Sequence, residues 1–328
     1  RPIQIEGRSQ PGYLGEPLVH LAAPDPRLGD AYGLIVAGGD SVVAGLAFTG
    51  FTRAGVLLQG AGGNFVESNV IGLLPGSTLA APNGEGVVIL GSSNNTIGGY
   101  GVQANVISGN RGAGVRVQAD AWGPAAGNLI LGNRIGTDGS GRVGVGNGGD
   151  GVLFVGAGGG RIADNVISAN LKNGVLLTDR SIGNLVTGNV VGLTEDGRSA
   201  LGNFGDGVRV DSSPSNVIGG GSPGASNQIS GNRGSGVRAL GDSSGLVIQG
   251  NRIGTDAGAE RALGNLGDGV TLYSSGVQVG GLSSGAGNVI AYNGQGSLGA
   301  GVQLVGQASG NTILSNRIFG NLGLGINL

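Results

Sequence analysis

The sequence contains no cysteine, one histidine and one lysine, and each scarcity excludes a class of chemistry. Without cysteine there is no disulfide framework, no thiolate nucleophile and no cysteine-based zinc or iron–sulfur site. The one imidazole, His20, is interpreted as a packed or exposed residue rather than a catalytic one. Aromatic residues make up only 4% of the chain. The net charge of −2 gives no electrostatic reason to bind nucleic acid or an anionic membrane.

Long hydrophobic runs are also missing, since no segment approaches the ~18 uninterrupted apolar residues of a membrane-spanning helix. The first residues, Arg1, Pro2 and Ile3, do not have the character of a signal peptide. We therefore expect the chain to be a mature or excised piece of a longer protein. Disorder is excluded because 39% of residues are hydrophobic and only 12% are charged. The chain is expected to pack.

Glycine is abundant, with 76 of the 328 residues. Such a content is typical of collagen or of low-complexity segments. Collagen is excluded because glycine has no three-residue period, as the glycine-free run Val152–Val155 shows.

Three phrases recur along the chain, each with a period of about 60 residues. The first has the form Asn-x-Ile, ends in a second Asn and is followed by Gly-Val; the second is of the type Gly-Asn-Leu-Ile; the third is Gly-Asn-x-Gly-Asp-Gly-Val. Each repeat of about sixty residues is interpreted as three shorter units of about twenty. The copies of the first begin at Asn105, Asn165, Asn227 and Asn288, those of the second at Gly127, Gly183 and Gly245, and those of the third span 146–152, 202–208 and 264–270.

Within each phrase the apolar residues alternate with period two, as in Val115 and Val117. Short alternating runs of β-branched residues bounded by glycine and asparagine predict short strands, and no stretch has a helical period. Strands that stack at ~4.8 Å per turn form a solenoid around a column of valine, isoleucine and leucine. The sequence therefore predicts an all-β, single-stranded parallel β-helix of about fourteen turns.

Asparagine and glycine are expected at the corners, because both accept left-handed backbone conformations and stacked amides can form a hydrogen-bonded ladder. The aspartates of the third phrase are predicted to be turn residues that bond backbone amides. Three turns, roughly 14 Å, would separate them, which is too far for a glycosidase pair or a shared calcium ion. The predicted turn residues are Asn110, Asn133, Asn170, Asn189, Asn232, Asn251, Asp150, Asp206 and Asp268.

These phrases resemble right-handed parallel β-helix repeats of the pectin-lyase-like superfamily, as found in large secreted or surface proteins of bacteria. The strings from Asn133 to Gly141 and from Ile318 to Ile326 add to this resemblance. It implies one β-helix domain over 1–328, less regular in 1–60 and clearly repeated in 61–328, as a segment of a larger extracellular or cell-surface protein. It does not imply an activity, because fold does not determine function.

Enzymatic members of that superfamily carry lyase, polygalacturonase or epimerase motifs, and none of these strings is present. We therefore predict no catalytic residue, no metal and no cofactor. The loops 137–147, 194–203 and 255–265 are expected to stack on one edge of the rod, where loops often bind ligands. Arg142, Arg198, Arg261 and Trp122 are the candidate ligand-binding residues, the arginines for anionic sugars and the tryptophan as a ligand anchor.

Two functional interpretations stay open. The leading one is a non-enzymatic structural or adhesive module that contacts a surface polysaccharide, or copies of itself end to end in a stalk or fibre. The alternative is a polysaccharide-active enzyme, lyase or glycosidase, or a carbohydrate-binding module. A groove that gathers two or three carboxylates and an arginine would favour the enzyme, and a smooth rod with single, periodic charges would favour the scaffold.

Overall fold

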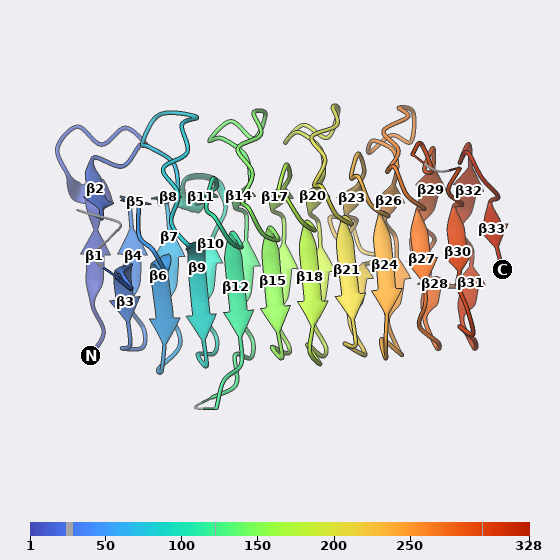
Figure 1. Ribbon diagram of the computed structural model, residues 1–328, viewed down its shortest axis with the longest axis horizontal. Coiled ribbons are helices and arrows are strands. Elements are labelled where there is room, and N and C mark those ends of the chain that lie inside the picture. The colour runs from blue at the N-terminus through green and yellow to red at the C-terminus, as the bar shows by residue number, and fades with distance from the viewer. Residues whose placement is uncertain (24–28, 122, 297) are drawn as a thin grey trace.

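The computed structural model describes residues 1–23, 29–121, 123–296 and 298–328. Three parallel sheets, here A, B and C, contain eleven strands each, and every sheet takes each third strand of the chain. Three successive strands therefore complete one turn, and eleven turns stack into a rod with the termini at opposite ends (Figure 1). This right-handed parallel β-helix confirms the predicted fold, and eleven turns are close to the expected fourteen.

The strands are short, and their bounds follow the repeats. Sheet A contains β1 (Gln4–Glu6), β4 (Val42–Ala44), β7 (Phe65–Glu67), β10 (Thr96–Gly98), β13 (Leu129–Leu131), β16 (Arg161–Ala163), β19 (Leu185–Thr187), β22 (Val217–Gly219), β25 (Val247–Gln249), β28 (Gln278–Gly280) and β31 (Thr312–Leu314). Sheet B contains β2 (Val19–Ala22), β5 (Leu46–Thr49), β8 (Val70–Ile71), β11 (Val106–Ile107), β14 (Arg134–Ile135), β17 (Val166–Ile167), β20 (Val190–Val191), β23 (Gln228–Ile229), β26 (Arg252–Ile253), β29 (Val289–Ala291) and β32 (Arg317–Phe319). Sheet C contains β3 (Tyr32–Val36), β6 (Ala54–Gln59), β9 (Glu85–Leu90), β12 (Val115–Gln118), β15 (Val152–Val155), β18 (Val175–Thr178), β21 (Val208–Asp211), β24 (Val237–Leu240), β27 (Val270–Leu272), β30 (Val302–Leu304) and β33 (Ile326–Asn327).

Two short 3-10 helices, η1 (Gly7–Ser9) and η2 (Gly101–Gln103), complete the regular structure of the described residues. In this part of the chain, no helix has the length and apolar character needed to cross a membrane.

The core is a single apolar column inside the rod. In β12 the side chains of Val115 and Val117 are fully buried, whereas Arg116 between them points outward. The two-residue strands of sheet B follow the same alternation, because Ile107 and Ile135 are fully buried and stack directly on one another. Period-two alternation is therefore enough to decide which side chains face the core.

Asparagine ladders run along the corners of the rod, and the ladder at the C–A corner includes Asn64, Asn95 and Asn128. Asn165 Oδ1 accepts hydrogen bonds from the backbone N–H of Asn133 at 2.9 Å and from its Nδ2 at 3.1 Å, and Asn133 Nδ2 also donates to the carbonyl of Ile97. Each amide is buried, and these bonds satisfy its polar atoms, which would otherwise be costly in the core. The A–B corner ladder includes Asn133, Asn189 and Asn251, and the B–C corner ladder includes Asn110, Asn170 and Asn232.

The repeat of about sixty residues corresponds to two turns. Val115 pairs with Val152, and Val152 pairs with Val175, so Val115 and Val175 are two turns apart. The division into three units of about twenty residues is wrong, because the recurring phrases mark individual strands and corners rather than whole turns. Every second turn carries a longer loop at the B–C corner, closed by an antiparallel bridge, and these loops rise along the upper edge of Figure 1. The bridges are Leu73–Ala80, Thr137–Gly144, Leu193–Ala200 and Thr255–Ala262.

Candidate functional site

The outer face of sheet B is a row of outward-facing side chains, one from each turn. It is mainly apolar, with arginine at three positions, and exposed His20 stands at its first position. His20 Nε2 lies 2.7 Å from the hydroxyl of Thr49. Strand register aligns His20, Ala47, Val70, Val106, Arg134, Val166, Val190, Gln228, Arg252, Val289 and Arg317.

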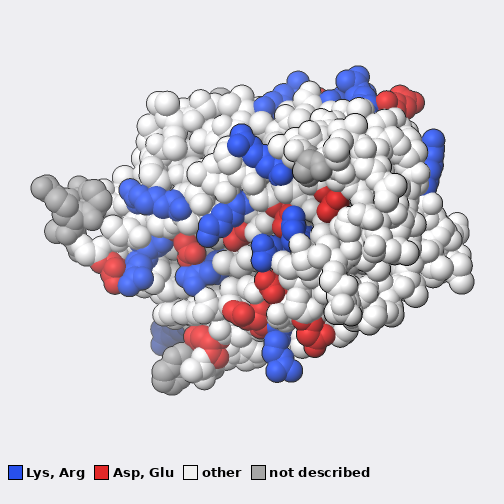
Figure 2. Space-filling model, turned by 45° about the vertical axis from the view of Figure 1, so that its right-hand side comes forward, with Lys and Arg blue, Asp and Glu red and all other residues white. Residues whose placement is uncertain are grey.

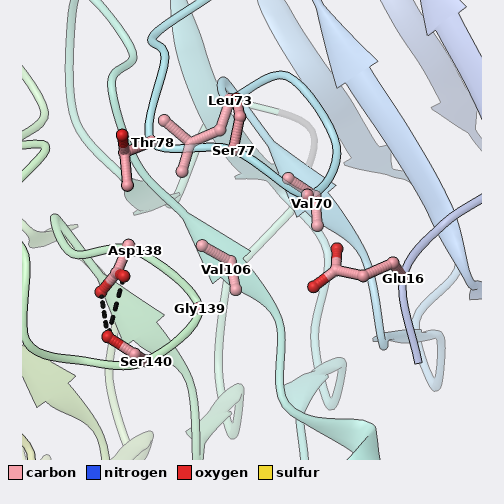
Figure 3. Close-up of a pocket in the computed structure, with 10 residues that line it drawn as sticks. Glu16, Val70, Leu73, Ser77, Thr78, Val106, Asp138, Gly139 and Ser140 are labelled. Atoms are coloured by element: carbon pink, nitrogen blue, oxygen red, sulfur yellow. Dashed lines mark hydrogen bonds between the residues drawn. The ribbon is translucent and has the colours of Figure 1, made fainter. Parts of the chain in front are cut away.

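A hollow of about 220 Å³ lies on this row, between the loop of Leu73–Ala80 and the loop of Thr137–Gly144. In Figure 3 the carboxylates of Glu16 and Asp138 lie on opposite sides of the hollow, and Val70 and Val106 lie between them. Both oxygens of Asp138 accept a hydrogen bond from the hydroxyl of Ser140, at 2.8 Å. The first hollow thus combines an apolar floor with an acidic group on either side.

Three more hollows adjoin this one. The second shares Glu16 and Gly139 with the first and adds Tyr13 and Arg134. The third shares Gly101 and Arg134 with the second. The fourth shares Tyr100 and Asp164 with the third. Because each hollow shares lining residues with the next, they form one groove. We call it the sheet B groove; it runs along the outer face of the sheet and ends at the A–B corner.

Charged groups from distant turns meet in the third hollow. Arg134 forms an ion pair with Glu195 at 2.6 Å, and Tyr100 Oη donates a hydrogen bond to Asp164 at 2.8 Å. That hydrogen bond is the main reason why the pKa of Tyr100 is raised above its ordinary value. This hollow therefore contains two carboxylates, an arginine and a tyrosine, although 61 and 64 residues separate the members of the two pairs.

Asp164 has an unusual backbone conformation for its position. Its φ is 58°, and the corner residues before and after it, Gly132 and Gly188, have φ of 66° and 69°. This left-handed region favours glycine and costs an ordinary L-residue roughly 1–2 kcal/mol. An aspartate is kept at a corner that neighbouring turns fill with glycine, and its carboxylate points to Tyr100.

The predicted ligand-binding arginines lie on the longer loops and do not line the four hollows. Arg142 lies 3.5 Å from Asp196, and Arg261 lies 3.8 Å from Asp256, with both arginine side chains largely exposed. The backbone N–H of Arg198 donates to Asp196 at 3.1 Å. Trp122 lies outside the described residues. Binding by these four residues stays a prediction.

Asp150, Asp206 and Asp268 lie on the B–C corner, away from the groove. Asp150 accepts the backbone N–H of Asn173 at 2.9 Å, Asp206 that of Ser235 at 2.8 Å, and Asp268 that of Ala300 at 2.8 Å. In each case the donor belongs to the next turn. Successive aspartates are therefore two turns, or about 10 Å, apart rather than three turns and 14 Å.

The outer face of sheet C carries paired charges. Figure 2 shows acidic and basic side chains interspersed rather than separated by sign. The pairs are Arg116 with Glu85 at 2.7 Å, Arg238 with Asp206 at 2.9 Å and Arg209 with Asp211 at 3.2 Å. Among the described residues, no group of three or more histidine, cysteine, aspartate or glutamate side chains is arranged to hold a metal ion.

A family model described as "Right handed beta helix region" matches residues 29–253, more than half of the chain. The chain belongs to this family. Among curated proteins, no sequence matches this β-helix.

Solved structures share its fold. The Dettilon tailspike protein is 17% identical, with a TM-score of 0.62, and the match covers 99% of this β-helix and 60% of the tailspike chain. The A-module of the Azotobacter vinelandii mannuronan C-5 epimerase AlgE4 is 16% identical, with a TM-score of 0.61 and coverage of 91% and 74%. The periplasmic alginate epimerase AlgG is 13% identical, with a TM-score of 0.55 and coverage of 100% and 75%. At these identities the likeness establishes the fold alone.

Proposed function

We propose that this β-helix binds an extended polysaccharide in the sheet B groove and acts as an adhesive module outside the cell. The observation that carries the proposal is the chain of four adjoining hollows, which runs along the outer face of sheet B to the A–B corner. A linear glycan is a long, thin ligand, and a groove parallel to the rod axis suits such a shape. The epimerases that share the fold are named for alginate or mannuronan, which supports this ligand class.

The lining of the groove also suits sugars. Val106 offers apolar surface for the C–H face of a pyranose ring, and the exposed ring of Tyr100 offers an aromatic one. Glu16 and Asp138 offer acceptors for hydroxyl groups, and Arg134 offers a donor. A few placed polar groups on an apolar floor are the usual composition of a ligand site.

A second candidate function, glycan cleavage, is favoured by the third hollow. It gathers Asp164, Glu195 and Arg134, a combination of carboxylates and arginine that an acid–base mechanism requires. In this case Asp164 and Glu195 would act on a glycosidic bond lying across the hollow.

One experiment tests both functions. The purified chain is screened against a glycan array and soluble polysaccharides, and the release of reducing or unsaturated ends is measured in parallel. We expect binding without release, and we expect Arg134→Ala to weaken binding about tenfold through loss of a charge-assisted hydrogen bond. The control is Lys172→Ala, which removes an equal charge from an exposed position at the B–C corner.

Binding that is unaffected by Arg134→Ala would place the ligand elsewhere and overturn the proposal. If the wild type releases chain ends and Asp164→Asn or Glu195→Gln abolishes that release, glycan cleavage is established instead. If the wild type shows neither binding nor release, both proposed functions are contradicted.

A further inference from the structure

The fourth hollow differs from the other three in its position. We call it the corner pocket; it has a volume of about 460 Å³ and is lined by Tyr100, Arg161, Asp164, Leu185, Thr187 and the segment 222–225. Arg161 and Leu185 belong to sheet A, so the pocket lies at the A–B corner and not on the floor of sheet B. It meets the other three hollows of the sheet B groove only through Tyr100 and Asp164.

Two long corners flank this pocket. Over three turns the A–B corner is formed by links of only two residues, so nothing protrudes from the rod there. These links join β13 to β14, β16 to β17 and β19 to β20. The links from β10 to β11 and from β22 to β23, residues 99–105 and 220–227, are longer. Tyr100 comes from the first long corner and residues 222–225 from the second. The pocket is therefore an open recess between two walls, at the end of the groove.

The chemistry of the pocket is that of a sugar site with one cationic group. Tyr100 is 62% exposed and Leu185 is 41% exposed, so an aromatic and an aliphatic residue line the recess with accessible surface. Within the described part of the chain, Arg161 has no ion pair and no side-chain hydrogen bond, although its charge acts on Tyr100 through space. Most arginines that line the groove are ion-paired, as Arg134 is with Glu195. A free guanidinium beside an aromatic face is arranged to receive an anionic group on a ring.

Asp164 completes the pocket. Its carboxylate already accepts the Tyr100 hydroxyl, and its remaining lone pairs are available to accept ligand hydroxyl groups. The same hydrogen bond holds the long corner 99–105 against a turn two positions further along. The left-handed backbone of Asp164 keeps the carboxylate at the boundary between groove and pocket.

We propose that the corner pocket binds a single branch sugar that carries a carboxylate, while the main chain of the same glycan lies in the sheet B groove. The inference rests on the proposed function and adds to it the branch as the determinant of specificity. Arg161 pairs with the branch carboxylate, Tyr100 and Leu185 pack against the ring, and Asp164 accepts a ring hydroxyl. The wall formed by 222–225 limits the branch to a short one.

The test uses monosaccharides small enough to enter the pocket alone. Binding of methyl glucuronide, its methyl ester and methyl glucoside to the whole chain is measured by ligand-observed NMR and calorimetry. We expect the glucuronide to bind about tenfold more tightly than the neutral sugars, and Arg161→Ala to remove that preference. Leu185→Trp, which fills the recess without changing charge, is expected to abolish binding of all three. Lys172→Ala is the charge-matched control and should leave binding unchanged.

The outcomes separate this inference from the proposed function. Equal affinity for glucuronide and glucoside, no binding of any monosaccharide, or an unchanged preference in Arg161→Ala would overturn the branch site. If linear glycans still bind and Arg134→Ala weakens that binding, the proposed function of the groove is retained. Conversely, monosaccharide binding that depends on Arg161, without any binding of linear glycans, would overturn the groove and retain an acidic-sugar site at the corner. Circular dichroism of each variant shows whether the fold is preserved.

Discussion

At the scale of single residues, glycine has two separate roles in this β-helix. Gly183 has a φ of +70° and open space around the position of a Cβ atom, so it serves a left-handed corner. Gly207, which precedes a strand of sheet C, has no such φ; a Cβ atom there would lie 2.4 Å from Ile229 Cγ2 and 2.7 Å from the carbonyl oxygen of Gly236. The glycine of the Gly-Val phrase is thus required by close contact with the next turn, and not by a left-handed corner conformation.

This difference predicts unequal costs for the same substitution. Gly207→Ala is expected to lower the free energy of unfolding by about 3 kcal/mol, because backbone and a buried side chain must move. Gly183→Ala should cost about 1 kcal/mol, from left-handed strain alone. Denaturant unfolding of both variants measures the two values. Equal losses would contradict the assignment of Gly207 to turn-to-turn packing.

At the scale of elements, the longer loops at the B–C corner are folded by local hydrogen bonds. Asp196 accepts the hydroxyl of Thr194 at 2.7 Å and the backbone N–H of Arg198 at 3.1 Å. The Thr194 hydrogen bond, followed by that of Arg198, lowers the pKa of Asp196 below its ordinary value. The ionised carboxylate therefore helps to hold the loop of Leu193–Ala200 in shape.

A lowered pKa in the folded state makes this loop sensitive to acid. The stabilisation by Asp196 is fully present above the unfolded pKa of about 3.9 and is lost as the pH falls through the folded value. We expect the exchange rate of the Arg198 amide, corrected for its intrinsic pH dependence, to rise below about pH 4. We also expect Thr194→Val to move the pKa of Asp196 toward the ordinary value. NMR titration measures both, and an ordinary pKa in the wild type would refute the assignment.

At the scale of the whole molecule, the rod is a one-dimensional stack in which each turn contacts mainly its neighbours. The longer loops occupy every second turn, and they already touch at that spacing, since the N–H of Glu195 donates to the carbonyl of Gly141 at 2.9 Å. If the loops occurred on consecutive turns, the spacing between two loops would be only about 5 Å, which leaves no room for both. This crowding explains why the sequence repeats every two turns. End-to-end stacking of copies stays a prediction.

Deletions in ladder register test this explanation. Removing 165–226 takes out two turns and places Asn227 in the ladder position of Asn165, so the loops still alternate. Removing 165–188 takes out one turn, places Asn189 there and puts two long loops on consecutive turns. We expect the two-turn deletion to fold and to unfold cooperatively, and the shorter one-turn deletion to be less stable. Circular dichroism and thermal unfolding compare them, and equal or reversed stabilities would count against loop crowding.

The sequence by itself determined the fold, because the signals for a β-helix are local and repeated. Alternation in Val115–Val117 decides which side chains face the core, and asparagine at corners such as Asn133 is recognisable from its phrase alone. The length of a turn was not determined, because phrases of similar composition mark every strand. The groove was decided only by the tertiary structure: Tyr100, Arg134, Asp164 and Glu195 lie far apart in the chain. Stacking in register brings them together, since each turn adds only ~4.8 Å of height however many residues it contains.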